Sequence, residues 1–120
     1  MKILDDQLKH LRNAIRYSWS GLKIAFRKEK AFQQELLVLL FVIPVGICLG
    51  DTGVKRALFI GSWMLVIVVE LINSAIEAAI DRVGFEHHKL SGRAKDFGSA
   101  SVFCSILLAI TVWVLIIFSH

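Results

Sequence analysis

Charged side chains are missing from a long stretch near the end of this 120-residue chain. Residues 97–118, "FGSASVFCSILLAITVWVLIIF", contain no Asp, Glu, Lys or Arg. About 20 helical residues cross the hydrocarbon core of a bilayer, so this stretch predicts a transmembrane helix. Hydrophobic residues make up 56% of the chain, which excludes an ordinary soluble domain, because so small a core cannot enclose that much apolar surface.

Proline and cysteine are also scarce. The single proline, Pro44, lies in an apolar stretch at about 32–50, where its missing backbone donor is expected to kink a helix. Cys48 and Cys104 lie in apolar stretches at no recognised motif spacing, and we expect them to be inert packing residues. Internal repeats and low-complexity segments are absent, so we expect a single membrane domain over residues 1–120.

A cleavable leader pattern is absent from the opening "MKILDDQLKHLRNAIRYSW", which has no continuous apolar core and no small-residue cleavage site. Instead, apolar residues recur at helical spacing over residues 1–30, and Lys and Arg occupy another face. This pattern predicts a basic amphipathic helix along the membrane surface. With further apolar stretches at about 32–50, 55–82 and 97–118, the predicted fold class is all-α integral membrane, with an N-terminal surface helix and three transmembrane helices.

Positive charge is distributed unevenly along the chain. Eight of the 14 Lys and Arg residues precede Ala31, and four more lie in the loop predicted at 81–96. By the positive-inside bias, the N terminus and this loop face the cytoplasm. The net charge of +4 then reflects attachment to a membrane. Without a soluble basic domain or a known reading module, no nucleic-acid partner is expected.

Acidic residues interrupt the second apolar stretch, in "ELINSAIEAAIDR" (70–82). On a helix, Glu70, Asn73, Glu77 and Asp81 share one face and form a polar stripe about 16 Å long. Unpaired carboxylates are costly inside a membrane, so a functional role is favoured over simple adhesion between subunits. For Asn73 alone the two readings are equally good, because a buried amide commonly joins transmembrane helices.

The depths of the acids in the membrane predict different roles for them. Mg²⁺ prefers oxygen ligands and is often shared between a few carboxylates and a phosphate chain. Glu77 lies near the cytoplasmic end of its helix, and Glu29 lies at a similar depth, within reach of a metal–nucleotide. Glu70 lies about two turns deeper, where a lipid headgroup would be met. The stripe therefore favours phosphoryl transfer at the membrane interface.

Another class of protein also fits an acid inside a membrane helix. A small proton-coupled transporter or channel would have one and would assemble as an oligomer. Three features favour phosphoryl transfer over transport. Only three spans are predicted, the 81–96 loop is rich in charge, and two acids lie at a depth that a nucleotide can reach. The tripeptide "DFG" (96–98) occurs in protein kinases, but the Gly-rich loop, the β3 lysine, the HRD motif and a Walker A sequence are all missing, which excludes a soluble kinase fold.

The stretch "ELINSAIEAAIDR", followed by "SGRAKDFGSA", closely resembles the signature of the prokaryotic diacylglycerol kinases, a family that also includes undecaprenol kinases. The resemblance extends to "YSWSGL", "AFQQE" and a terminal "W…SH". It implies a homotrimer of three-span subunits in the bacterial inner (cytoplasmic) membrane, with active sites shared between subunits. It also implies transfer of the γ-phosphoryl of MgATP to a lipid hydroxyl at the cytoplasmic face. The terminal pattern and "HHKLSGRAKDFGSASV" favour diacylglycerol over undecaprenol.

The resemblance assigns roles to individual residues. Glu70 matches the general base, Glu29 and Glu77 match the carboxylates that hold Mg²⁺, and Asn73 is expected to orient a glutamate or a substrate oxygen. The implied ATP-contacting positions are His10, Tyr17, Glu29, Glu77, Glu86, His87, His88, Lys95 and Asp96. The implied lipid-contacting positions are His10, Ala14, Tyr17, Ser18, Trp19, Ala31, Phe32, Gln34, Glu35, Arg56, Ser99 and Trp113. His10 departs from the family pattern, because the best-known members carry an arginine there.

Overall fold

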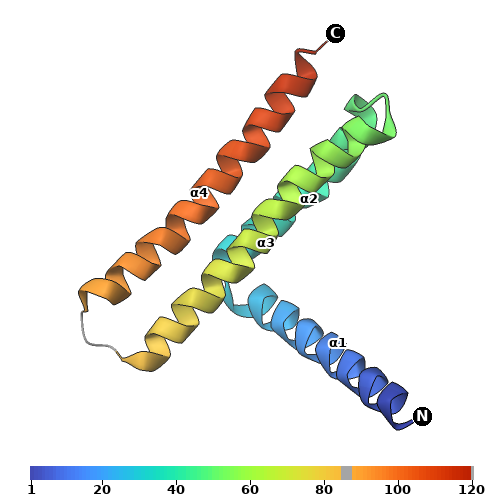
Figure 1. Ribbon diagram of the computed structural model, residues 1–120. Helices are drawn as coiled ribbons and strands as arrows, with labels where there is room; N and C mark the ends of the chain where they lie inside the picture. The colour runs from blue at the N-terminus through green and yellow to red at the C-terminus, as the bar shows by residue number, and fades with distance from the viewer. Residues whose placement is uncertain (85–87, 120) are drawn as a thin grey trace.

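Four helices make up the computed structural model, which describes residues 1–84 and 88–119. They are α1 (Lys2–Lys28), α2 (Lys30–Leu49), α3 (Gly53–Val83) and α4 (Lys89–Ile117). Helices α2, α3 and α4 run up, down and up beside one another, and α1 leaves this bundle at a steep angle (Figure 1). Three helices are long and apolar enough to cross a membrane. The predicted all-α class, with an N-terminal helix and three spans, is confirmed.

Helix α3 is the centre of the bundle, because both α2 and α4 pack along it. The side chains of Phe59 and Val66 on α3 are fully buried. The ring of Trp113 on α4 packs against Phe59 in a tilted arrangement, with the ring centroids 4.5 Å apart, and its indole Nε1 donates to the Phe59 carbonyl at 3.0 Å. Many large apolar side chains on the outer faces, such as Leu40 and Leu115, stay exposed, as a lipid or subunit environment requires.

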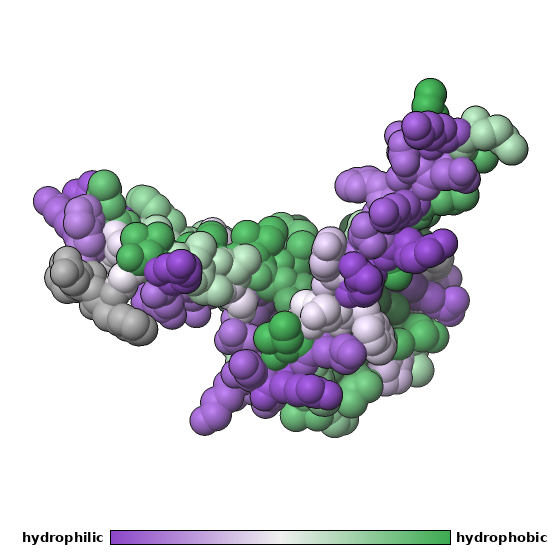
Figure 2. Space-filling model, turned by 90° about the horizontal axis from the view of Figure 1, so that it is seen from below, coloured by the Kyte–Doolittle hydropathy of each residue, from purple (hydrophilic) through white to green (hydrophobic). Residues whose placement is uncertain are grey.

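Helix α1 is amphipathic and meets the bundle only near its end. Hydrophilic side chains crowd the arm that α1 forms in the view from below (Figure 2). The helix ends at Lys28, because Glu29 has an extended backbone (φ −103°, ψ 108°). Across this break, the Gln33 side-chain amide donates to the Phe26 carbonyl at 2.7 Å. This bond fixes the corner between the surface helix and the first span.

A short turn joins α2 to α3 at the opposite end of the bundle. Arg56 Nε donates to the carbonyls of Ile47 at 3.1 Å and Gly50 at 2.9 Å, so it caps the end of α2. A Cβ at Gly50 would lie 2.6 Å from Arg56 Cγ, so the side chain passes directly over the glycine. Thr52 caps α3 by accepting the Lys55 backbone N–H at 3.2 Å. Helix α2 itself continues on both sides of Pro44.

Helix α4 begins at Lys89, whereas its apolar part was expected to begin at residue 97. Its first turns contain Lys89, Arg93, Lys95 and Asp96, which were expected in a loop over 81–96, and Asp81 and Arg82 of the same range belong to the last turn of α3. Lys, Arg and Asp are all tolerated in an exposed helix, and the side chain of His88 caps α4 by accepting the Leu90 N–H at 3.0 Å. The "GRAKD" residues therefore project from a helix at defined positions.

Candidate functional site

The polar stripe of α3 passes from the interior of the bundle to its surface. Glu70 and Asn73 are buried, with exposed fractions of 6% and 8%. Glu77, one turn further on, is half-buried, and Asp81 is exposed. The side chains thus form a continuous path from an apolar interior to the end of the helix, as the spacing predicted.

Helix α4 meets this stripe at two points. Gly98 packs directly against the Asn73 side chain. One turn earlier on α4, Lys95 Nζ lies 2.9 Å from Asp81 Oδ1. Glu77 lies between these two contacts, and its Oε1 accepts a hydrogen bond from Asn73 Nδ2 at 3.4 Å. Glu77 therefore lies on α3 between two residues, Asn73 and Asp81, that contact α4.

Two more acids come from the corner between α1 and α2. Glu29 is half-buried at the break, and Glu35 is buried near the start of α2. Glu70 lies within electrostatic reach of Glu29 and Glu77, and Glu35 lies within reach of Glu70. In the described part of the chain, the salt bridges join Lys55 to Asp51 and Lys95 to Asp81 and include none of these four acids. Acids held together without a base are typical of a site that binds a cation or transfers a proton.

The acids do not form a closed metal cage. Among the residues described, no three His, Cys, Asp or Glu side chains are arranged to hold an ion by themselves. Mg²⁺, however, usually takes one or two carboxylates and completes its shell with water and substrate phosphates. The carboxylates of Glu29 and Glu77 are hard oxygen ligands of this kind, so their donor chemistry would fit a metal that arrives with a nucleotide.

A cavity of about 520 Å³ opens between α1 and α3 beside the acids. Glu29 contributes a charged group to its wall, and Ser18 and Ser74 contribute hydroxyls. The rest of its lining is small or apolar: Gly21, Leu22, Ile24, Ala25, Leu71, Ala75 and Ala78. The face of α3 that lines the cavity adjoins the polar stripe through Ser74. An aliphatic molecule with a polar end fits this lining.

A second cavity, of about 560 Å³, lies between α1 and α2. Its lining combines apolar side chains with two cations: Trp19, Leu22, Lys23, Phe26, Arg27, Phe32 and Leu36. Trp19 and Phe32, two predicted lipid-contacting residues, therefore meet in one groove. Ala31, Gln34 and Glu35 lie on the adjoining first turns of α2, and Leu22 lines both cavities.

Two predicted lipid-contacting residues lie elsewhere in the single chain. Arg56 caps α2 at the far end of the bundle, about 20 Å along α3 from Glu70 at the helical rise of 1.5 Å per residue. Trp113 packs on Phe59 in the same distant half. Within one subunit, both side chains have structural roles.

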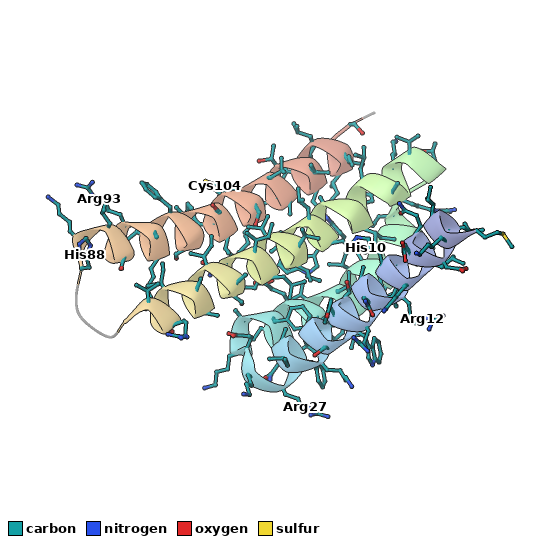
Figure 3. The ribbon with its side chains drawn as sticks, turned by 60° about the horizontal axis from the view of Figure 1, so that its bottom comes forward. His10, Arg12, Arg27, His88, Arg93 and Cys104 are labelled. Atoms are coloured by element: carbon teal, nitrogen blue, oxygen red, sulfur yellow. The ribbon has the colours of Figure 1, made fainter. Side chains whose placement is uncertain are left out.

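The predicted nucleotide-contacting residues also divide into two groups. Lys95 and Asp96, with Ser99 of the lipid set, lie on the early turns of α4, close to the N-cap residue His88. His10 lies on the exposed arm of α1, as do Ala14 and Tyr17, and Figure 3 shows His10 well apart from His88 and Arg93. Glu86 and His87 lie outside the described residues. One chain does not gather the whole predicted set.

Comparison with known proteins places the sequence in a family. The profile of the family described as "Prokaryotic diacylglycerol kinase" matches residues 16–117. The chain belongs to the prokaryotic diacylglycerol kinase family. Three relatives are each named diacylglycerol kinase, and each match covers most of this chain and most of the relative. The Escherichia coli K12 protein is 47% identical over 104 residues, 87% of this chain and 85% of its own. The Haemophilus influenzae protein is 48% identical over 106 residues, covering 88% and 90%. The Pseudomonas aeruginosa protein is 44% identical over 110 residues, covering 92% and 89%.

Membership of the diacylglycerol kinase family makes the chain a bacterial membrane protein and a lipid kinase. This bears out the resemblance seen in "ELINSAIEAAIDR" and "SGRAKDFGSA" and disfavours the transporter. His10 and Ala14 precede the residues that the family profile matches. The roles assigned to these two residues, like those of all the other site residues, remain predictions.

Two residues beside the acids were not among the predicted site residues. Gly98, within the "GRAKDFGSA" stretch, permits the close approach of α4 to Asn73. Trp63 on α3 donates its indole N–H to the Glu35 backbone carbonyl at 2.9 Å and fixes the turn that carries Glu35. Gly98 lies in a stretch that resembles a family signature, and this was a signal by which it could have been found. Trp63 lies in an apolar stretch without a motif, so the sequence contained no signal for it.

Proposed function

We propose that this diacylglycerol kinase family member transfers the γ-phosphoryl of MgATP to the hydroxyl of diacylglycerol, giving phosphatidic acid. The observation that supports this most directly is the position of Glu70. It is buried beside Glu29 and Glu77, which lead toward the polar end, and it adjoins a face of α3 that lines an apolar cavity. A water-soluble triphosphate and an apolar alcohol can approach such a group from two different sides.

In this proposal Glu70 is the general base. Its carboxylate accepts the proton of the lipid hydroxyl while the hydroxyl oxygen forms its bond to the γ-phosphorus and ADP leaves. Burial next to apolar side chains excludes water, which would otherwise compete as the phosphoryl acceptor. Positioned bases of this kind contribute about 10²–10⁴-fold to rate.

Glu29 and Glu77 would hold Mg²⁺, which when bound neutralises charge on the phosphates. The amide of Asn73 donates to Glu77 and aims its carboxylate. Lys95 of α4 lies near Glu77 and Asp81 of α3, and its ammonium group is suited to phosphate oxygens. Asp96 and His88 add proposed nucleotide contacts from the same end of α4, and His10 and Tyr17 add them from α1. Glu86 and His87, which lie outside the described residues, are also proposed to contact the nucleotide.

The lipid would enter beside α1. Ser18 lines the cavity next to Glu29, and Trp19 and Phe32 line the neighbouring groove. With Ala14, Ala31, Gln34, Glu35 and Ser99, these residues form the proposed lipid-contacting surface. The basic face of α1 supports its placement at the cytoplasmic surface of the inner membrane, where anionic headgroups attract Lys and Arg.

We further propose a homotrimer with active sites shared between subunits. The separation of His10 from His88 supports this arrangement, because one chain keeps the two groups apart (Figure 3). The exposed apolar faces of the spans support it as well, since neighbouring subunits can cover them. In a trimer, Arg56 and Trp113 of one chain also become available to a neighbour.

Transfer of labelled phosphate in mixed micelles tests the proposal. The purified protein, supplied with MgATP, is given diacylglycerol and undecaprenol together at equal surface concentration. We expect labelled phosphatidic acid as the main product. Undecaprenyl phosphate as the main product would assign the chain to the other branch of the family, and no labelled lipid at all would contradict the proposed activity.

A further inference from the structure

Gly98 makes the closest approach between α3 and α4 at the site. The residue is buried, and a Cβ built on it would overlap Asn73 Oδ1 and lie 3.3 Å from Asn73 Cγ. Asn73 is itself buried, so its side chain has little space into which to retreat. Any side chain at position 98 must therefore displace the Asn73 amide or separate the two helices.

The Asn73 amide has a defined orientation. Its Nδ2 donates to Glu77 Oε1 at 3.4 Å, and its buried Oδ1 has no hydrogen-bond partner. The Cα–H of Gly98 that stands in place of a Cβ faces this oxygen, a contact that is weakly favourable at helix interfaces. The reversed amide would turn Oδ1 toward the Glu77 carboxylate, where two acceptors repel each other. Gly98 and Glu77 thus fix the amide from opposite ends.

The exposed contact between Lys95 and Asp81 joins the same two helices, one turn before Gly98 on α4. Glu77 lies between the two contacts on α3. A change at Gly98 is transmitted to Glu77 because the Asn73 side chain contacts both residues. The apolar cavity that Glu29 and Ser18 line lies on another face of α3, away from Gly98.

We propose that Gly98 is a positioning residue for the metal-binding carboxylate of Glu77 and acts through the amide of Asn73. This inference rests on the proposed function, in which Glu77 holds Mg²⁺. A methyl group at position 98 pushes the Asn73 amide from its place, and Glu77 loses the N–H that aims it. Outer-shell groups of this kind change metal affinity or activity by about 10–100-fold.

The test compares Gly98→Ala with Gly92→Ala on the same helix. A Cβ at Gly92 meets nothing within 4 Å, so this variant is the matched control. Alanine is the better helix former at both positions, so helix propensity acts equally in the two. Calorimetry in detergent micelles measures binding of a non-hydrolysable ATP analogue with and without Mg²⁺. We expect Gly98→Ala to bind the Mg²⁺ complex about tenfold more weakly. The metal-free analogue and the KM for lipid should not change, and Gly92→Ala should match the wild type.

Equal binding of the Mg²⁺ complex by Gly98→Ala and the wild type would overturn the inference. If Gly98→Ala does not fold, the double variant Asn73→Ala/Gly98→Ala removes the overlap and restores space between the helices. We expect it to fold and to bind the Mg²⁺ complex about tenfold more weakly, and wild-type affinity in this variant would overturn the inference. A wild-type protein that binds the complex but phosphorylates no lipid would contradict the proposed function instead, and the alanine comparison would still decide the role of Gly98.

Discussion

Lys95 on α4 and Asp81 on α3 form a salt bridge at 2.9 Å, one turn from the point where Gly98 meets Asn73. The lysine proposed to contact phosphate oxygens is therefore paired with a carboxylate of α3. The pair is exposed, so its members can separate readily. Binding of a nucleotide would exchange one anionic partner of Lys95 for another.

If a nucleotide displaces Asp81 from Lys95, substitutions of these two residues should change the KM for ATP differently. Lys95→Met should raise the KM for ATP by about tenfold or more, because a charge-assisted contact to phosphate is lost. Asp81→Asn should leave the KM for ATP unchanged or slightly lower, since the lysine then has no competing carboxylate. Steady-state kinetics with ATP as the varied substrate measures both. A rise in KM for Asp81→Asn equal to that for Lys95→Met would contradict the exchange.

The contact between α2 and α3 depends on Gly46. A Cβ there would lie 3.1 Å from Phe59 Cβ and 3.3 Å from Ile60 Cγ1, in a packed part of the bundle. Gly46→Ala should therefore destabilise the protein by about 1–3 kcal/mol through overpacking. Gly61→Ala is the control, because a Cβ at Gly61 meets nothing within 4 Å. Unfolding in mixed micelles by added denaturing detergent measures the difference, and equal stability of the two variants would refute the close packing.

Trp63 should link stability to lipid binding. Trp63→Phe removes the indole donor to the Glu35 carbonyl at 2.9 Å and should cost about 0.5–1.5 kcal/mol of stability. Because this bond fixes the turn that carries Glu35, we also expect a raised KM for lipid with an unchanged KM for ATP. Kinetics with each substrate varied in turn separates the two effects. A change in the KM for ATP alone would show that this turn does not serve the lipid.

Removal of Mg²⁺ should abolish activity without unfolding the protein. In the proposed function Glu29 and Glu77 supply only part of a metal shell, so the ion is expected to act with the nucleotide and not as a structural element. Excess chelator should stop lipid phosphorylation, and added Mg²⁺ should restore it. Helix content measured by circular dichroism should stay constant throughout. Loss of helix content on chelation would contradict this account.

The sequence predicted the elements of this fold well, because each depends on a local pattern. The apolar stretches and the basic amphipathic opening correspond to α1–α4, and the spacing of Glu70, Asn73 and Glu77 placed them on one face. The start of α4 was predicted too late, since hydropathy marks the part of a helix inside lipid and ignores the charged turns that extend beyond it. The early start matters, because it places Lys95 on α4 opposite Asp81.

The sequence patterns could not predict which residues of neighbouring helices contact one another. That Gly98 faces Asn73, or that the indole of Trp63 reaches the carbonyl of Glu35, depends on the rotation and separation of two helices. A hydrophobic period fixes neither quantity to the accuracy of a single side chain. The depth of the acids indicated different roles for them, the family resemblance assigned those roles, and the structure brings Glu29, Glu35 and Glu77 each within electrostatic reach of Glu70.

The most direct test of the central claim is the turnover rate of Glu70→Gln with diacylglycerol and MgATP in mixed micelles. Glutamine keeps the shape of the side chain and removes the proton acceptor, so kcat should fall by about 10²–10⁴-fold while the KM for lipid changes little. Asp51→Asn makes the same chemical change at an exposed acid far from the site and should retain wild-type turnover. Turnover of Glu70→Gln within twofold of the wild type would contradict the account.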